Sequence, residues 1–523
     1  MKRKFACLLA SLLVALSATG CSSSGNNEQS TSSNTTSQES ESSSVSATQQ
    51  DTGSTEPVDL YIEIITWGTE DPDTNEVFDK VNEITVPAIG ARINPVMVSI
   101  SEMTTKLGMM VASGETIDLV ESGMLTTPTN LVTQGLLQPM TDYLSEDLVE
   151  MAGPTLEACM YQNEIYAYPN STYVGNYSMF VYDAALAEEY NIEIPDSIQS
   201  AEEWEALFSQ VKESGMPQYA ISLGDGVNQE LYWNPKLEGL GDSTTFAAGA
   251  LLNMFDDDTT IVNYYATDEY KEICDMHRDW YEKGYAIPDS ISSGYTTTDT
   301  LTQGTVFGYL TPVGANGGVK GLENTVGGKE LGGILVGDGT MYASTRNVLS
   351  SCWSIAATSE NPQAVCDFLD LMYTNTELSN LLNYGIEGKH YVTTEGSRII
   401  DFPEGVDVTT VGYGHQGTSF GDLSNRYFRA PVTDEWVNNE LEKYSLENTN
   451  FSKYMGYVFD ETEYQAEMSN IRATISTYGP SLSCGTVDPD EVIPEFLQEL
   501  ESAGINDVIA ANQEQFNDWL ASK

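Results

Sequence analysis

The sequence predicts an α/β fold built around a parallel sheet. Segments 58–66, 92–98 and 116–120 are rich in β-branched and aromatic residues and each predict a strand. Segments 73–84 and 103–112 lie between them and predict helices, the second ending shortly before Gly114. Strands that alternate with helices favour parallel pairing, because a parallel neighbour has to be reached through a crossover connection.

Further helices are predicted along the rest of the chain. Segment 268–283 carries apolar side chains on one face and ends at Gly284. Another helix begins at Asn361-Pro362, since proline is tolerated in the first turn. Segments 492–500 and 508–520 predict two terminal helices on either side of Gly504. The globular body is therefore expected to run from about residue 58 to residue 523.

The N-terminal 20 residues predict a secretion signal. Basic residues 2–4 precede an apolar run, 5–16, which is too short to span a bilayer comfortably. Small residues then lead to Cys21 in a pattern that resembles the lipobox of bacterial lipoproteins, although Ala18 stands where leucine is usual. The resemblance implies that residues 1–20 are a signal peptide and that Cys21 is lipidated. The alternative is an ordinary signal peptide that is cut near Ala18.

Residues 22–57 consist almost entirely of small and polar amino acids and contain neither lysine nor arginine. Such a segment has little apolar surface to bury, so it is expected to stay disordered. A flexible chain of this length has a root-mean-square reach of roughly 30–35 Å. Residues 21–57 are therefore predicted to tether the body to the outer face of a cell membrane.

Charge and cysteine content exclude several classes of function. The chain has 22 Lys+Arg and 78 Asp+Glu, a net charge of −56, which becomes −59 when the three basic residues of the signal are removed. A body this acidic repels phosphate backbones, so nucleic-acid binding is not expected. Five widely spaced cysteines follow Cys21 without a Cys-x-x-Cys motif, which predicts neither a disulfide framework nor a zinc site. No metal ion or cofactor is predicted.

Two catalytic motifs match around one glycine-rich stretch, but neither has the context that its chemistry needs. Residues 412–417 fit G-x-G-x-x-G, yet residues 418–422 are a poor start for the helix that a dinucleotide site requires. Residues 417–421 fit G-x-S-x-G, whose fold places the catalytic histidine after the serine. All three histidines precede Ser419. No catalytic residue is therefore predicted.

Several blocks, in order along the chain, resemble the extracellular solute-binding proteins of ABC importers, in the family 1 group that includes sugar binders. The blocks are Leu107–Val120, Gly135–Leu144, Asn163–Pro169 and Ser359–Ala364. The most specific string, Asn383–Tyr391, is typical of a Gram-positive subgroup of these lipoproteins. The resemblance covers nearly all of residues 58–523.

The resemblance implies a two-lobed, periplasmic-binding-protein-like α/β fold with a ligand cleft between the lobes. Lobe 1 would comprise residues 58–170 and about 345–385, and lobe 2 about 171–344 and 386–523. A monomeric, non-catalytic protein would capture a small solute, a sugar or oligosaccharide, and deliver it to the permease subunits of an ABC transporter. Closure of the lobes around the ligand would signal capture. A peptide or amino-acid receptor, or a secreted glycan-degrading enzyme, are the alternatives.

Candidate ligand-binding residues follow from the position of ligands at the carboxyl ends of strands in α/β sheets. Aromatic faces, carboxylates, amides and arginine suit the recognition of sugars, whereas core packing is the alternative for each aromatic residue. Some candidates follow the predicted strands, some follow the Pro169 turn, and others lie near later crossings between the lobes. They are Trp67, Glu70, Glu121, Ser122, Tyr173, Asn176, Trp233, Arg346, Trp353 and Tyr384.

Overall fold

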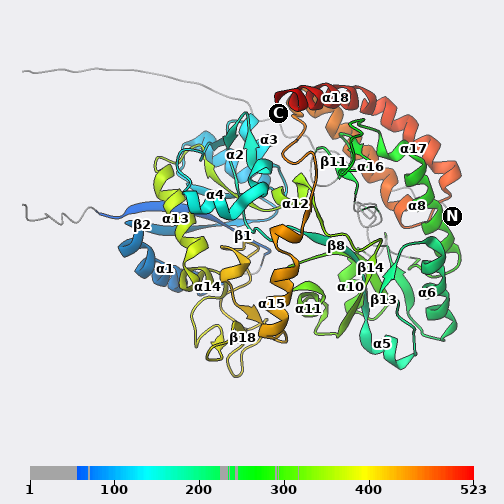
Figure 1. The fold of residues 1–523 in the computed structure, drawn as a ribbon, viewed down its shortest axis with the longest axis horizontal. Helices are drawn as coiled ribbons and strands as arrows, with labels where there is room; N and C mark the ends of the chain where they lie inside the picture. The colour runs from blue at the N-terminus through cyan, green and yellow to red at the C-terminus, as the bar shows by residue number, and fades with distance from the viewer. Residues whose placement is uncertain are drawn as a thin grey trace, which may run out of the picture. The chain divides into compact units, whose positions relative to one another are not determined.

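Two sheets organise the globular body in a computed structural model of the chain (Figure 1). The structure describes residues 56–68, 71–223, 234, 236–241, 245–288, 291, 294–315 and 317–523. The signal, Cys21 and the tether predicted from the sequence lie outside this range, as do Glu70 and Trp233.

The first sheet has the strand order β2-β1-β3-β16-β4, and β7 also pairs with β16. β1 is parallel to both β2 and β3, as predicted, whereas β16 runs antiparallel to β3. The predicted strand at 116–120 begins later than expected, at Leu119, and the predicted helix at 73–84 continues to Ile89 despite Pro87. The strands of this sheet are β1 Val58–Thr66, β2 Ala91–Ser99, β3 Leu119–Ser122, β4 Leu137–Gln138, β7 Tyr168–Pro169 and β16 Cys352–Ala356.

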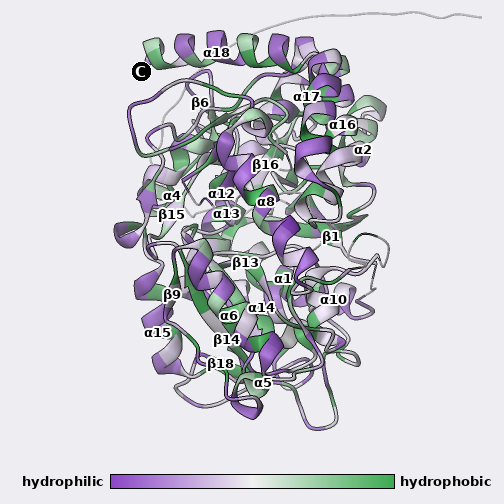
Figure 2. Cartoon of the chain, turned by 90° about the vertical axis from the view of Figure 1, so that its right-hand side faces the viewer, coloured by the Kyte–Doolittle hydropathy of each residue, from purple (hydrophilic) through white to green (hydrophobic). Residues whose placement is uncertain are grey.

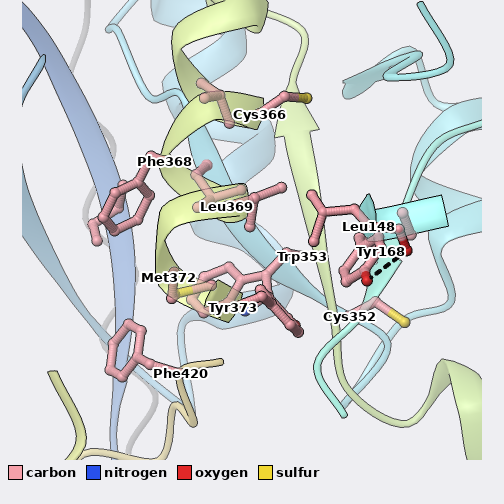
Figure 3. Packing of buried hydrophobic residues seen from close by; sticks show 14 of the residues in the cluster. Leu148, Tyr168, Cys352, Trp353, Cys366, Phe368, Leu369, Met372, Tyr373 and Phe420 are labelled. Carbon is pink, nitrogen blue, oxygen red and sulfur yellow. Dashed lines mark hydrogen bonds between the residues drawn. The ribbon is translucent and has the colours of Figure 1, made fainter. Parts of the chain in front are cut away.

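Helices cover both faces of the first sheet. Leu60, Ile62 and Ile64 point to one face of β1 because side chains alternate along a strand, and they share a core with helices α1, α13 and α14. Figure 3 shows Phe368 and Leu369 of α13 in this core. The opposite face packs against α2 and α3. These helices are α1 Thr74–Ile89, α2 Met103–Ser113, α3 Pro128–Thr133, α13 Pro362–Thr374 and α14 Thr376–Tyr384.

The second sheet has the strand order β10-β13-β8-β14-β9, with β15 pairing with β8 and β20. This sheet is mixed: β8 is antiparallel to both β13 and β14, whereas β10 is parallel to β13 and β9 to β14. β8 enters the sheet directly from a segment that leaves the first sheet, and its neighbours return in the opposite direction. The strands are β8 Asn176–Asp183, β9 Ser197–Ile198, β10 Tyr219–Ser222, β13 Val306–Gly314, β14 Leu331–Val336, β15 Tyr342–Ala343 and β20 Asn450–Phe451.

Helices also flank the second sheet, and a helical group lies at the C-terminus. One face of the sheet packs against α6 and Trp280 of α8, and the other against α10 and α11. The last three helices share a core with Tyr264, Tyr265 and Tyr270, and α18 alternates hydrophobic and hydrophilic residues along its length (Figure 2). The helices are α6 Ala201–Glu213, α8 Asp268–Glu282, α10 Thr297–Thr302, α11 Gly318–Glu323, α16 Gln465–Ser483, α17 Pro489–Ala503 and α18 Ile505–Ser522.

Short elements complete the body. The five cysteines after Cys21 are buried. Among the described residues, no helix combines the length and the apolar character needed to cross a membrane. The short elements are α4 Glu146–Ala152, α5 Ala184–Glu189, α12 Thr345–Leu349, α15 Asp434–Lys443, β5 Met160–Tyr161, β6 Glu164–Ile165, β11 Glu238–Gly239, β12 Ala250–Leu251, β17 Val392–Thr393, β18 Ile399–Asp401 and β19 Phe428–Arg429, with 3-10 turns at Gly153–Cys159, Tyr264–Ala266, Asn324–Val326, Leu423–Asn425, Leu446–Asn448 and Thr462–Tyr464.

Two segments, 170–175 and 344–351, connect the sheets directly: the first joins β7 to β8 and the second joins β15 to β16. Both segments are called crossings below, and the lobe boundaries near residues 170 and 345 stay predictions. The segment after residue 386 was expected in lobe 2, but Tyr413 and Phe420 pack in the core of the first sheet. Residues 413–420 therefore belong with the first sheet, and the remaining lobe boundaries stay a prediction.

Candidate functional site: a cavity between the two sheets

A cavity of about 330 Å³ lies where the crossings meet the edges of both sheets. This volume is at the lower end of the range typical of small-molecule sites. The cavity is called the inter-lobe cavity below. Its lining residues are Asn170, Ser171, Tyr173, Val174, Asn176, Pro312, Val313, Gly314, Ala315, Gly318, Leu322, Asn347, Val348, Ser350, Ser351, Ser419, Leu423 and Arg426.

Asn170 joins the two crossings at the wall of the cavity. Its side-chain amide donates to the Ser351 hydroxyl at 2.9 Å, and its backbone N–H donates to the Ser351 carbonyl at 3.0 Å. The side-chain oxygen of Asn170 accepts a hydrogen bond from Nε1 of Trp353 at 3.1 Å. Asn170 is buried, and buried polar groups need such partners. These bonds fix the relative position of the two crossings next to the cavity.

A second buried contact ties the first crossing to the segment that carries Ser419 and Arg426. The backbone N–H and the hydroxyl of Thr172 both donate to Oδ2 of Asp422, at 3.1 and 2.7 Å. Burial raises the pKa of the neighbouring Tyr173 phenol, and the Asp422 charge raises it further. Tyr173 is therefore a neutral hydroxyl that can donate to a ligand at the cavity wall.

A pair of buried carboxyl groups lies behind Ser351. Oε2 of Glu63, on β1, accepts the backbone N–H of Glu121, on β3, at 3.1 Å, and the Ser351 hydroxyl donates to Oε1 of Glu121 at 2.7 Å. Burial raises the pKa of Glu63 to about 8, and that of Glu121 to about 7, against the lowering effect of hydrogen bonds from Ser351 and Thr418. Desolvation disfavours the charged forms, so Glu63 is mostly protonated at neutral pH.

Three of the residues predicted from the sequence lie in or beside the cavity. Tyr173 and Asn176 line it, and the Asn176 amide donates to the Val174 carbonyl at 2.9 Å. Glu121 contacts the lining residue Ser351. Ser122 is buried behind them, where its hydroxyl lies 2.8 Å from that of Ser354.

Trp67 lies at the carboxyl end of β1, where its ring is 59% exposed. Segment 416–418 runs beside it: the N–H of Gly417 donates to the Ile65 carbonyl at 2.8 Å, and a Cβ at 417 would overlap the Trp67 ring. The cavity residue Ser419 follows directly. An exposed indole at the end of a strand is accessible, and contact of Trp67 with a ligand stays a prediction.

The other predicted aromatic residues have different surroundings. Trp353 has no exposed surface and stacks on Phe420 with ring centroids 5.6 Å apart (Figure 3). A side chain with no accessible surface does not contact a ligand in this conformation, so Trp353 supports the site from behind through Asn170. The Tyr384 hydroxyl donates to the Tyr427 carbonyl at 2.5 Å, outside the cavity lining.

Arg346 lies on α12 and lines a separate, small space that also includes Gly123 and Tyr457. Glu70 and Trp233 lie outside the described residues. The structure thus brings Tyr173, Asn176 and Glu121 together, and it places Arg346 and Tyr384 elsewhere.

Sequence reasoning missed four polar residues of this site: Asn170, Ser351, Asp422 and Arg426. Asn170 follows the Asn163–Pro169 block directly, which is the one signal that could have identified it. The others come from positions far along the chain, without a motif of their own.

The glycine-rich stretch at 412–417 has a structural role. The backbone N–H groups of Gly414 and His415 donate to Asp71, and Nδ1 of His415 lies 2.5 Å from Asp71 Oδ1. A Cβ at 412 would overlap the Asp73 carboxylate. These contacts hold the loop beside β1 and explain why glycine is needed there. Among the described residues, no group of three or more His, Cys, Asp or Glu could hold a metal ion.

Comparison with known proteins agrees with this architecture. A protein family described as "Domain of unknown function (DUF3502)" matches residues 453–521. A "Carbohydrate ABC transporter substrate-binding protein" of Streptococcus pneumoniae serotype 4 (strain ATCC BAA-334 / TIGR4) is 25% identical over 463 residues, which cover 87% of this chain and 90% of the relative.

Solved structures share the fold. The crystal structure of the N-glycan transport solute binding protein (NgtS) from Streptococcus pneumoniae has a TM-score of 0.74 and 22% identity, covering 89% of this chain and 99% of that one. An HMO binding ABC-transporter associated solute binding protein from Bifidobacterium longum infantis has a TM-score of 0.59 and 14% identity, covering 88% of this chain and 99% of that one. The predicted two-lobed α/β fold is therefore confirmed.

Proposed function

We propose that the chain captures an oligosaccharide between its two lobes and delivers it to an ABC permease. The support is its similarity to a carbohydrate ABC transporter substrate-binding protein and to a solute-binding protein of known structure. The observation that carries the proposal is the inter-lobe cavity, whose lining comes from both crossings and from the edge of the second sheet. A ligand that contacts both lobes stabilises the closed state by its difference in affinity between the open and closed states.

The polarity of the cavity suits a neutral, hydroxyl-rich ligand. Asn170, Asn176 and Ser351 offer amide and hydroxyl groups, and Tyr173 adds an aromatic ring with a neutral hydroxyl. The pneumococcal relative is named for carbohydrate transport, and the pneumococcal NgtS has been solved with Man5GlcNAc. Binding without turnover accounts for this arrangement, since the proteins it resembles are transporter components rather than enzymes.

The ligand class can be tested with a thermal-shift screen of the Glu56–Lys523 body against sugars, oligosaccharides and peptides. A ligand present at 100 times its Kd adds about 2.7 kcal/mol to the free energy of unfolding. We expect oligosaccharides to raise Tm. A rise in Tm with peptides alone would replace this proposal with a peptide receptor, and consumption of a glycan during the assay would replace it with a hydrolase.

We further propose that Cys21 is lipidated after removal of residues 1–20, so that the body faces the outside of the cell. The tether then keeps the captured ligand near the permease. A Cys21→Ala variant should appear in the culture medium, while the wild-type chain stays with the membrane fraction. Retention of Cys21→Ala in the membrane fraction would contradict the anchor.

A further inference from the structure

A second and larger cavity, of about 890 Å³, lies between the first lobe and the C-terminal helix α18. It shares no lining residue with the inter-lobe cavity. One wall is the β5–β6 hairpin with Tyr161 and Asn163, and the other carries Asp460, Trp519 and Lys523. This space is called the α18 cavity below, and its volume is enough for several sugar rings.

The hairpin wall has a fixed shape. Met160 pairs with Ile165 and Tyr161 with Glu164, so Gln162 and Asn163 form a two-residue turn. Both turn residues have positive φ, 51° and 67°, as the tight turns of β-hairpins require. The turn presents two side-chain amides at the mouth of the cavity, next to the half-buried Tyr161 ring.

The α18 wall is also fixed. The Gln515 side chain clamps the backbone of Asp460: its amide donates to the Asp460 carbonyl at 3.1 Å, and its oxygen accepts the Asp460 N–H at 3.0 Å. The Asp460 charge contributes, after burial, to a raised pKa of the Tyr161 phenol on the opposite wall. Both walls line the same cavity, so one ligand can contact both of them.

The positive charge of Lys523 in the lining of the α18 cavity is paired with the carboxylate of Glu157. Lys523 Nζ lies 2.8 Å from the Glu157 carboxylate and 4.3 Å from the centre of the Trp519 ring. An ion pair that spans both walls leaves no excess positive charge for an anion, and a chain with a net charge of −56 repels anions further. Aromatic rings beside amides and a carboxylate instead match the apolar faces and the hydroxyl groups of a neutral sugar.

We propose that the α18 cavity is a second saccharide site, which binds a neutral oligosaccharide between Tyr161 and Trp519 independently of the inter-lobe cavity. The region matched by the domain of unknown function, residues 453–521, supplies Asp460, Gln515 and Trp519, so this site gives that region a role. The inference takes the ligand class from the proposed function but places it on separate residues.

The test is isothermal titration calorimetry of the full chain in detergent, with Man5GlcNAc and a panel of neutral oligosaccharides up to millimolar concentration. We expect two binding events. Trp519→Ala and Tyr161→Ala should each weaken one event at least tenfold and leave the other unchanged, and Trp519→Phe should retain part of it. Tyr219→Ala removes an exposed tyrosine from β10, away from both cavities, and serves as the matched control.

The outcomes separate the two sites. A single event that Tyr173→Ala abolishes and that Trp519→Ala and Tyr161→Ala leave unchanged would overturn the second site and keep the proposed function. A single event that depends on Tyr161 and Trp519 alone would support the second site and contradict capture in the inter-lobe cavity. The second site would also be overturned if neither Tyr161→Ala nor Trp519→Ala weakened the binding of any oligosaccharide. It would be overturned as well if these variants weakened the binding of acidic oligosaccharides only. Tyr161 is tested separately because Trp519 packs against Phe516 and its loss could weaken the fold.

Discussion

Ser351 donates a hydrogen bond to Glu121 across 2.7 Å, and so connects the wall of the inter-lobe cavity to a buried carboxyl group in the first sheet. The same hydroxyl accepts the amide of Asn170, from the other crossing. Glu121 in turn donates its backbone N–H to Glu63. Changes in the protonation of the two acids therefore occur next to the junction of the lobes, which makes stability at this junction dependent on pH.

The first prediction concerns Glu63. Its pKa is about 8 in the folded chain against 4.5 for the unperturbed group, so the folded state binds more protons between these values. Its contribution to stability is full below about pH 4.5 and is lost as the pH rises through 8. The Glu63→Gln side chain cannot ionise. As the pH rises from 5 to 8.5, the free energy of unfolding of Glu63→Gln should therefore increase relative to that of the wild type by roughly 2–4 kcal/mol.

This difference can be measured by urea unfolding at both pH values. Glu115→Gln, which changes an exposed carboxyl on the same lobe, is the control for the general effect of removing a charge. Equal pH dependence in the wild type and in Glu63→Gln would show that the Glu63 carboxyl is not the group that titrates.

The second prediction concerns Trp67. Because its ring is 59% exposed at the end of β1, its removal should weaken oligosaccharide binding at least tenfold while Tm changes little. Calorimetric titration and thermal unfolding of Trp67→Ala give both quantities. Met109→Ala removes an equally exposed apolar side chain from α2 and should leave affinity unchanged. An unaltered Kd for Trp67→Ala would remove this residue from the site.

The third prediction concerns Trp353, whose side chain is fully buried. Trp353→Ala leaves a cavity against Phe420 and removes the donor to Asn170, so it should cost about 3–5 kcal/mol of stability. Trp353→Phe retains much of the packing but loses the hydrogen bond, so its free energy of unfolding should lie between those of the wild type and Trp353→Ala. Chemical denaturation measures the loss. A loss below 1 kcal/mol for Trp353→Ala would contradict a core position.

The fourth prediction compares two glycines with positive φ. Gly123, at φ 102°, lies against α12, and a Cβ there would overlap the carbonyl oxygen of Leu349. Gly90, at φ 66°, ends α1 with open space around it. Gly90→Ala should cost about 1 kcal/mol of stability from backbone strain alone. Gly123→Ala should cost at least 3 kcal/mol more, or prevent folding, because the crossing segment has to move. Equal losses of stability in Gly90→Ala and Gly123→Ala would mean that α12 can move away from position 123 without a measurable free-energy cost.

Local sequence identified several of the longer helices and strands but few of the short ones. β1 was predicted with its observed bounds because alternating and β-branched side chains specify a strand, and α13 because Pro362 favours a first turn. The ends of α1 and β3 were less accurate: α1 continues five residues beyond the predicted end at residue 84, and the residues before Leu119 resemble a strand without pairing as one.

The candidate site was only partly accessible from the sequence. Tyr173 and Asn176, named because they follow a recognisable turn block, line the cavity, and Glu121, named because it ends a strand, contacts its wall. Their contact with a ligand stays a prediction. Trp353 was named as a candidate with core packing as the alternative. The structure places it in the core, because β16 is buried along its whole length, and a strand covered on both faces has no alternation that reveals where a side chain points. The strand directions of the second sheet were not predicted, because its pairing joins strands that are distant along the chain.

The sequence by itself predicted the α/β class and carried the resemblance to solute-binding proteins, whereas the tether at residues 21–57 stays a prediction. Only the tertiary structure decided which residues share the cavity. Asn170 and Ser351 are separated by 181 positions, and Thr172 and Asp422 by 250, yet each pair is joined by hydrogen bonds. Contacts of this kind arise because the chain crosses between the lobes and returns, so their partners are set by packing and not by spacing along the sequence.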